Sequence, residues 1–304
     1  MNALGPSTEV ATVGEAIGYK SELLWRIRTL LRGLGFAEVV TPVFRQADDL
    51  TGLRPPAEVG GRGFLRSMIG PALRYNLQHT PRVYEIGACF RPDQPDPTHS
   101  REFSMLDLYA ADESFEFLIA LAERLVHLAY PGPLPRISVA EHLTATLGVD
   151  LVSETLDAHT GALAQHLHLP KNTPLRDLLD AYIRAELEPR TLGSAATLTD
   201  MPLGGNEPCA QRRRGTAAVL NRFEVFINGL EVVHGYEDET DTDEFVTRAR
   251  GVGLFNPEQQ RIVDAVRDGT VPAHSVGLGI GIERLCMAAT GVADIAQFRQ
   301  SACF

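Results

Sequence analysis

The sequence predicts an α+β fold in which an antiparallel sheet is flanked by helices. Two pairs of apolar, strand-like segments are each joined by a turn: residues 82–90 with 103–110, and residues 222–228 with 230–236. Hairpins of this kind pair strands antiparallel, whereas a βαβ winding would put a helix between successive strands. The helical segments are grouped along the sequence and do not alternate regularly with strands. The chain also lacks the GxxxxGK[ST] loop of P-loop nucleotide-binding proteins.

The first expected elements are one long helix and several short segments. Apolar residues three and four positions apart predict a helix from Lys20 to Leu34, and Gly33 and Gly35 mark its end. Pro42 suits the edge or the end of a strand, because proline cannot donate a ladder hydrogen bond. The segments expected next are a strand at 36–43, a loop at 46–63, a strand near 63–67 and a short helix at 73–77.

The rest of the chain continues with hairpins and helices. Asn228-Gly229 joins two expected strands and suits a type I′ turn, in which both central residues have positive φ. A polar, proline-rich turn joins the other strand pair and carries Arg91 and His99. The remaining expected elements are a helix at 115–128, a mostly helical stretch at 142–188, a strand at 275–280 and a helix at 282–289.

Length and composition favour one large domain over residues 1–304. The chain has 304 residues, 44% of them hydrophobic, and no linker divides it. Residues 1–12 are expected to be flexible, and residues 131–195 to form a helical, insertion-like region. Apolar stretches fall short of the roughly 18 residues of a membrane span, and no signal peptide is recognisable, so a soluble, cytoplasmic protein is expected. The four cysteines lack CxxC spacing, which favours reduced thiols over a zinc site.

The acidic balance of the chain disfavours non-specific binding to nucleic acid. Lys and Arg number 28 against 39 Asp and Glu, which gives a net charge of −11. Arg212-Arg213-Arg214 forms a dense basic run, and such a run is more typical of a solvated loop than of a phosphate clamp. We therefore expect neither tRNA nor a membrane among the partners.

Two arginines stand in contexts suited to a polyphosphate. Arg91 precedes His99 and the run Arg101–Tyr109. Arg284 belongs to the segment Gly277–Leu285, in which alternating glycines let the backbone lie flat against a ligand. A guanidinium is always charged and can bind two oxygens at once, so arginine suits the charge of a reacting phosphate.

These segments resemble motifs 2 and 3 of the class II aminoacyl-tRNA synthetases. Residues 20–43 resemble motif 1, which builds the homodimer interface in that family. The runs Phe90–Tyr109 and Arg222–Tyr236 are most similar to the lysyl-tRNA synthetase group and to its short paralogue, the ligase that joins lysine to elongation factor P. The resemblance implies a single catalytic domain without an anticodon-binding domain, a homodimer, and ATP and Mg2+ as cofactors.

The resemblance also assigns an ATP site. Arg91 would contact the α-phosphate and the substrate carboxylate, and Arg284 would cover the other face of the nucleotide, so these two are the expected catalytic residues. Glu224 and Glu231, on two strands expected to pair, would hold the magnesium ion. The other positions implied for this site are Asp93 and His99 near the adenine and the outer phosphates, Phe103 stacked on the adenine, and Gly281.

The implied amino-acid pocket departs from that of the lysine enzymes. Asp107, Tyr109 and Asp238 match the positions that meet the side-chain amine of lysine, but the usual glutamates are shortened to aspartates. Ile69 or Gly70 stands where a glutamate receives the α-amine, and a buried charge that loses its partner changes substrate choice. The other positions implied here are His234, which replaces an asparagine that helps hold the carboxylate, and Gly277.

The resemblance and its departures predict an ATP-dependent, AMP-forming ligase that makes an acyl- or aminoacyl-adenylate. The expected acyl donor is a lysine analogue, a β-amino acid or another non-standard acid, and the expected acceptor is an amine, a carrier protein or another non-tRNA nucleophile. Two alternatives stay open: the lysine ligase of elongation factor P, and a catalytically silent regulatory subunit. Retention of Arg91, Glu224, Glu231 and Arg284 counts against silence.

Overall fold

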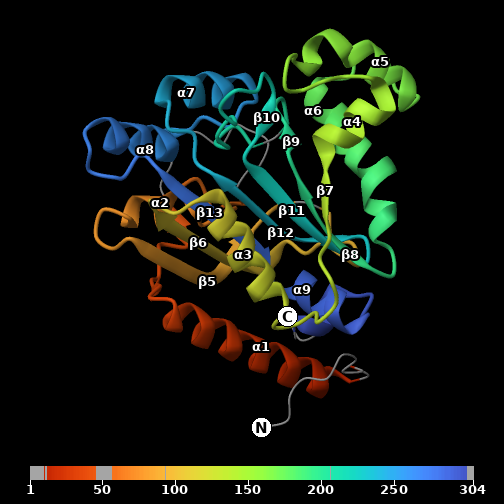
Figure 1. The fold of residues 1–304 in the computed structure, drawn as a ribbon. Helices are drawn as coiled ribbons and strands as arrows, with labels where there is room; N and C mark the ends of the chain where they lie inside the picture. The colour runs from red at the N-terminus through yellow and green to blue at the C-terminus, as the bar shows by residue number, and fades with distance from the viewer. Residues whose placement is uncertain (1–9, 11, 46–56, 93, 206, 300–304) are drawn as a thin grey trace.

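An eight-stranded sheet forms the centre of the computed structural model, which describes residues 10, 12–45, 57–92, 94–205 and 207–299 (Figure 1). Its strands are β1 (Ala37–Glu38), β5 (Arg82–Phe90), β6 (Glu102–Ala111), β7 (Arg136–Ser138), β8 (Ala195–Thr199), β11 (Arg222–Ile227), β12 (Leu230–Glu237) and β13 (Ser275–Gly281). The strand order is β1-β5-β6-β13-β12-β11-β8-β7. Neighbours are antiparallel except at the edges, where β1 and β5 pair in parallel, as do β7 and β8. The predicted α+β class with a largely antiparallel sheet is confirmed.

Three helices cover one face of this sheet. They are α1 (Val13–Gly33), α3 (Phe115–Val126) and α9 (Ile282–Thr290). Their buried apolar residues join those of the central strands in the largest core of the protein, together with the 3-10 turn η4 (Ile295–Phe298). The opposite face of the central strands is therefore left for other elements and for the candidate site.

Helix α1 confirms the first predicted helix but begins earlier than expected. It starts at Val13 rather than Lys20, because Thr12 and Glu15 form a capping box. The Thr12 hydroxyl accepts a hydrogen bond from the Glu15 N–H at 3.2 Å, and the Glu15 carboxylate accepts one from the Thr12 N–H at 2.9 Å. Gly35 follows the helix with φ at 80°, so its predicted end is correct.

The strand predicted at residues 36–43 is wrong over most of its length. Only β1 pairs with the sheet, through Ala37 and Glu38. The chain then turns away because Thr41 donates hydrogen bonds from its N–H and its hydroxyl to the buried carboxylate of Glu85, at 2.9 and 2.7 Å, instead of continuing the ladder. Arg66 pairs with the same carboxylate at 2.7 Å, so a buried ion pair anchors this corner.

The two predicted hairpins are confirmed. Strands β5 and β6 pair along their length, and β11 pairs with β12. Asn228 and Gly229 join β11 to β12 with φ of 51° and 79°, the signs that a type I′ turn requires. Strand β13 then inserts between the two hairpins, pairing with β6 on one side and β12 on the other.

The stretch predicted to be helical has its own core beside β8. Its elements are α4 (Val139–Leu147), η1 (Leu156–His159), α5 (Thr160–His166), α6 (Leu175–Tyr182), η2 (Ile183–Leu187) and η3 (Glu188–Thr191). Figure 1 shows these helices gathered at one end of the sheet. Their apolar residues pack with Leu198 of β8 and Phe226 of β11, so this region is continuous with the main sheet. Strand β7, which sequence periodicity did not predict, introduces it.

The remaining elements surround the open face. They are the short helix α2 (Gly70–Asn76), α7 (Thr242–Gly251), α8 (Pro257–Arg267), a small sheet of β2 (Phe44–Arg45), β3 (Ala57–Glu58) and β4 (Phe64–Leu65), and the pair β9 (Met201–Pro202) with β10 (Val219–Leu220). The helix predicted at residues 73–77 therefore begins at Gly70, with Pro71 in its first turn. None of the helices in the described part of the chain has the length and apolarity to cross a membrane.

Candidate functional site

Glycines of β13 make the floor of a groove between two larger neighbours. Gly279 pairs with Asp107 of β6 on one side and with His234 of β12 on the other. A Cβ at Gly279 would lie 2.7 Å from Asp107 Oδ1 and 2.8 Å from His234 Cε1. Glycine is therefore required here for the aspartate and the histidine to face each other across the strand.

The next row along the same strand holds two tyrosines. Gly277 pairs with Tyr109 of β6 and Tyr236 of β12. The two hydroxyl oxygens lie 2.7 Å apart in a hydrogen bond that passes over the glycine. A Cβ at Gly277 would meet the Tyr109 ring at 2.7 Å, so the second glycine also keeps space for aromatic side chains.

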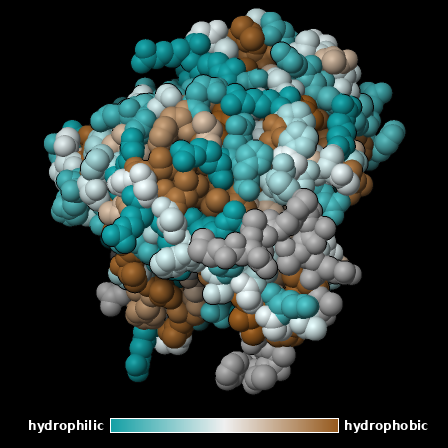
Figure 2. Space-filling model, turned by 60° about the horizontal axis from the view of Figure 1, so that its bottom comes forward, coloured by the Kyte–Doolittle hydropathy of each residue, from teal (hydrophilic) through white to brown (hydrophobic). Residues whose placement is uncertain are grey.

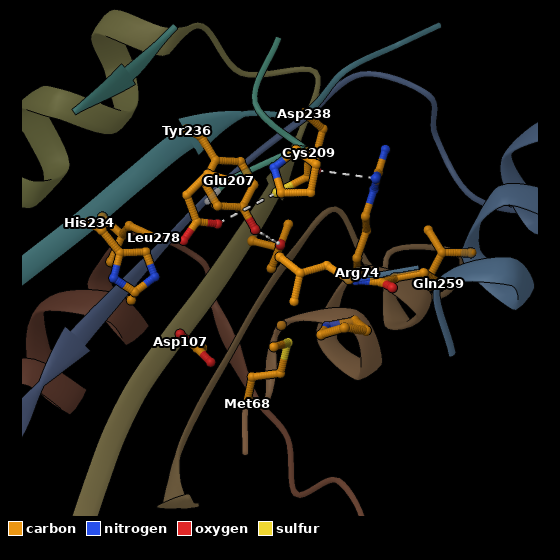
Figure 3. Close-up of a pocket in the computed structure, with 18 of the residues that line it drawn as sticks. Met68, Arg74, Asp107, Glu207, Cys209, His234, Tyr236, Asp238, Gln259 and Leu278 are labelled. Carbon is orange, nitrogen blue, oxygen red and sulfur yellow. Dashed lines mark hydrogen bonds and ion pairs between the residues drawn. The ribbon is translucent and has the colours of Figure 1, made fainter. Parts of the chain in front are cut away.

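A cavity of about 90 Å³ opens over these two rows, between the sheet and helices α2, α7 and α8 (Figure 3). Gly70 lines it, and Tyr109 Oη lies 3.4 Å from the position that a Cβ at Gly70 would take. The side chain of Ile69 is instead fully buried in a separate apolar cluster, and only its N–H contributes, donating to Asp107 Oδ2 at 3.2 Å. Of the two positions expected to replace the missing glutamate, Gly70 is the one in the pocket.

The pocket contains charged residues that sequence reasoning did not find. Arg74 of α2 lies 3.1 Å from Asp238 at the end of β12, and Glu207 lines the wall. In Figure 3, His234 lies on one side of the pocket and Arg74 with Asp238 on the other. Nothing in the local sequence around Arg74 indicates this role, because the contact joins a short helix to a distant strand.

Burial shifts the pKa of both aspartates of this pocket. It raises the pKa of Asp107, although His234 and the Ile69 N–H act in the opposite direction. It also raises the pKa of Asp238, opposed mainly by the charge of Arg74. Both carboxylates thus depend on specific partners to stay ionised.

A second cavity, of about 140 Å³, lies beyond Gly281 and contains both expected catalytic arginines. The Arg91 guanidinium carbon lies 5.0 Å from the centre of the Phe103 ring, in a cation–π contact, and Arg91 Nε donates to the Ser67 carbonyl at 3.4 Å. Phe103 therefore presents its ring to the cavity, with Arg91 over it. Arg284 lies at the start of α9 and lines the same cavity.

His99 links the two sides of this second cavity. Arg284 Nη2 donates to His99 Nε2 at 2.7 Å, and since arginine only donates, His99 carries its proton on Nδ1 and donates it to Asp96 at 2.9 Å. That hydrogen bond is the main cause that lowers the pKa of Asp96 to about 2. The loop between β5 and β6 is thereby held against Arg284. Asp93, expected in the same site, lies outside the described residues.

Glu224 and Glu231 line a third cavity, of about 260 Å³, beside α6 and β9. Glu224 forms an ion pair with Arg222, and Glu231 lies 3.6 Å from His234 Nδ1. Burial raises the pKa of Glu224. Burial acts in the same direction on Glu231, but the hydrogen bond and the charge of His234 outweigh it and lower its pKa.

His234 lines all three cavities. Glu231 is shared by the second and third, and Glu207 by the first and third. Apart from Ile69 and the undescribed Asp93, the structure brings the expected site residues together around one histidine.

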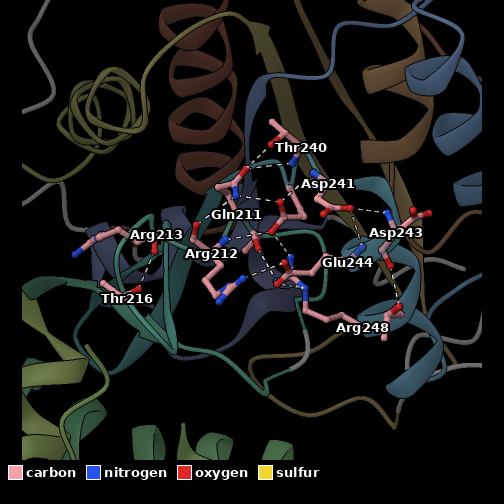
Figure 4. Close-up of polar contacts among 12 residues, drawn as sticks. Gln211, Arg212, Arg213, Thr216, Thr240, Asp241, Asp243, Glu244 and Arg248 are labelled. Atoms are coloured by element: carbon pink, nitrogen blue, oxygen red, sulfur yellow. Dashed lines mark hydrogen bonds and ion pairs between the residues drawn. The ribbon is translucent and has the colours of Figure 1, made fainter. Parts of the chain in front are cut away.

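The basic run lies outside these cavities. Arg212 contacts Glu244 at 3.3 Å (Figure 4). Arg213 pairs with Asp200. Figure 4 also shows Gln211, Thr240 and Arg248 in the same network. The two arginines thus hold β10 and α7 in place, in agreement with a loop rather than a phosphate clamp.

The sheet order, with a glycine-rich strand between two hairpins, defines a class II synthetase-type catalytic fold. The family model "tRNA synthetases class II (D, K and N)" matches residues 9–300, and the chain belongs to that family.

Curated relatives at about one-quarter identity refine the comparison. Lysine–tRNA ligases of Saccharolobus solfataricus and Streptococcus thermophilus are each 27% identical, over 308 and 310 residues. A probable cytoplasmic lysine–tRNA ligase of Enterocytozoon bieneusi is 26% identical over 333 residues. Each alignment covers 91% of this chain and 62% of the relative, so the chain spans less than two thirds of the length of these proteins.

Proposed function

We propose that this protein is an ATP-dependent ligase that joins the carboxylate of a non-standard amino acid to AMP and passes the acyl group to a non-tRNA acceptor. A carboxylate oxygen attacks the α-phosphorus of ATP, the bond to the pyrophosphate oxygen breaks, and pyrophosphate leaves. The observation that carries the proposal is the meeting of the Arg91–Arg284 cavity and the Asp107–Asp238 cavity at His234.

The arginines supply charge where the reaction develops it. Arg91 lies at the end of β5 over Phe103, where it can contact an α-phosphate and the substrate carboxylate together. Arg284, anchored by His99 and the Thr98 carbonyl, lines the same cavity. An adenine between Phe103 and Arg284 would stack on one ring and one guanidinium.

The third cavity is the proposed site for magnesium. Within the described residues, no group of three or more His, Cys, Asp or Glu is placed to hold a metal ion. Glu224 and Glu231 instead offer two carboxylates beside the nucleotide cavity, and Mg2+ usually takes one or two carboxylates with water and phosphate oxygens. When bound, it would neutralise charge on the phosphates, while the two glutamates hold it.

The acceptor and the assembly state also form part of the proposal. A net charge of −11 and the ion pairs of Arg212 and Arg213 favour an amine or a carrier protein over tRNA.

Figure 2 views the molecule from the side of α1 and shows hydrophobic surface patches there. Trp25 and Val13 on α1 are 67% and 55% exposed, and this helix is where a homodimer interface is expected. Sedimentation of a stable monomer would exclude the dimer.

Exchange of labelled pyrophosphate into ATP tests the adenylation step. The panel contains lysine, β-lysine, ornithine, arginine and uncharged amino acids. Exchange that depends on one of these compounds is the expected result. Absence of exchange across the panel, with ATP binding intact, would favour the silent regulatory subunit over the ligase.

A further inference from the structure

One end of the proposed amino-acid pocket is occupied by an ion pair. Arg74 Nη1 lies 3.1 Å from Asp238 Oδ1, and the two side chains are 8% and 1% exposed. Both residues line the pocket. Asp238 also accepts a hydrogen bond from the Ser275 hydroxyl through its other oxygen. The carboxylate expected to meet a substrate amine thus already has a cation beside it.

This pairing removes the net negative charge that a cationic side chain needs. Arg74 is always charged, so the pair is neutral when Asp238 is ionised and positive when it is protonated. A lysine ammonium buried beside it would receive no surplus counter-charge from this ion pair in either state, and burial of an uncompensated charge is costly.

The carboxylate available to a substrate ammonium lies instead at the other end of the pocket. Along β6, Asp107 lies between Phe103 of the nucleotide cavity and Tyr109. Asp107 accepts from the Ile69 N–H and faces His234 across Gly279. An α-ammonium next to the reacting carboxylate would lie near Asp107, which accounts for the loss of the glutamate at Gly70.

The ion pair also contains one donor and one acceptor with hydrogen-bonding capacity to spare. Arg74 Nε is buried without a hydrogen-bond partner in the described part of the chain, and Asp238 Oδ1 is buried with the 3.1 Å ionic contact to Arg74 Nη1 but no hydrogen bond. Buried polar atoms are nearly always satisfied, by protein, water or ligand. A carboxamide or ureido group matches both at once, because its carbonyl can accept from Nε–H and its N–H can donate to Oδ1.

We propose that the amino acid activated by this protein carries an uncharged carboxamide or ureido group at the end of its side chain. Arg74 and Asp238 form hydrogen bonds with that group, and Asp107 binds the α-ammonium. This inference rests on the proposed function, since it names the substrate class of the same site. Lysine and ornithine are then poor ligands, despite the family resemblance.

Calorimetric titration in the presence of a non-hydrolysable ATP analogue tests the inference. The ligands are asparagine, glutamine and citrulline, against lysine, ornithine, aspartate and glutamate. At least one amide or ureido amino acid is expected to bind tenfold or more tightly than lysine and ornithine. Tighter binding of a cationic or acidic amino acid, or no binding by the amide and ureido set, would overturn the inference.

Two substitutions give opposite shifts in preference. Arg74→Gln leaves Asp238 without its cation, so the affinity ratio of lysine or ornithine to the amide ligand should rise at least tenfold. Asp238→Asn leaves Arg74 unpaired and should raise the ratio for aspartate or glutamate instead. Arg213→Gln, which breaks a more exposed ion pair with Asp200 outside the pocket, is the control for loss of an arginine and should keep the wild-type ratios. Unchanged ratios in both folded pocket variants would overturn the assignment.

Binding and exchange separate this inference from the proposed function. Binding of an amide or ureido amino acid without pyrophosphate exchange would remove the adenylation step and keep the pocket assignment. Pyrophosphate exchange driven by lysine, with weak binding of the amide and ureido amino acids, would keep the adenylation step and remove the pocket assignment.

Discussion

Gly279→Ala tests whether the glycine strand sets the width of the amino-acid pocket. In a strand of ordinary φ, alanine in place of glycine normally stabilises the folded state by about 0.4–1 kcal/mol. Here the new Cβ would lie 2.7 Å from Asp107 Oδ1 and 2.8 Å from His234 Cε1, where ordinary contacts begin at 3.4 Å. Both side chains must therefore withdraw from the groove that they line.

The size of the effect follows from the overlap. Overpacking a filled site typically costs about 1–3 kcal/mol. We assume that this cost raises the free energy of the transition state, where about 1.36 kcal/mol corresponds to a tenfold change in rate. The kcat/KM for pyrophosphate exchange should then fall by about 5- to 150-fold. The thermal midpoint should fall as well, against the usual trend for glycine replacement.

Substitutions at two further glycines serve as controls for this measurement. Gly281→Ala places its Cβ 3.6 Å from Arg284, an ordinary contact, so it should lose less activity than Gly279→Ala. Gly161→Ala in α5 meets nothing within 4 Å and should leave exchange unchanged. Exchange by Gly279→Ala within twofold of the wild type would refute this account of the groove.

Three other substitutions probe the phosphate site, the buried corner and the helical region. Arg91→Lys keeps the charge but loses two-point contact, so kcat for exchange at saturating ATP should fall by about 10²- to 10³-fold. Glu85→Gln leaves Arg66 buried without its counter-charge, and urea unfolding should show a loss of about 3–5 kcal/mol. Burial lowers the pKa of His142, which contacts Tyr182 Oη at 2.6 Å, below its ordinary 6.5. The unfolded chain then binds more protons than the folded chain. The contribution of this histidine to stability is therefore fully present above pH 6.5 and is lost as the pH falls below 6.5. His142→Gln should reduce the drop in urea midpoint between about pH 7.5 and about pH 5.5.

Each of these expectations has a clear contrary result. Wild-type kcat in the lysine variant at position 91 would remove that arginine from the reaction. A loss below about 1 kcal/mol for Glu85→Gln would mean that Arg66 finds water or another partner. An identical pH dependence with and without His142 would falsify the assignment of acid sensitivity to that histidine.

The sequence by itself determined the features that depend on neighbouring residues. Alternating apolar residues and Asn228-Gly229 specified the hairpin of β11 and β12, since strand pairing through a two-residue turn is local. The contexts of Arg91 and Arg284 were sufficient to predict that the two arginines line one site, and both line the cavity beyond Gly281. Local signals were missed at Thr12, whose capping box starts α1 early, and at Asp241 and Asn256, whose side chains cap α7 and α8.

Only the tertiary structure decided what lies at the end of the amino-acid pocket. Asp238 taken alone suggests a counter-ion for a substrate amine, and Arg74 taken alone is one charged residue in a short helix. Their distance of 3.1 Å arises because α2 packs across the open face of β6 and places Arg74 beside the end of β12. Such a contact leaves no periodicity in the chain, because it depends on how two elements dock and not on their neighbours. The same docking neutralises the charge of Asp238 that the pocket would otherwise offer to its ligand.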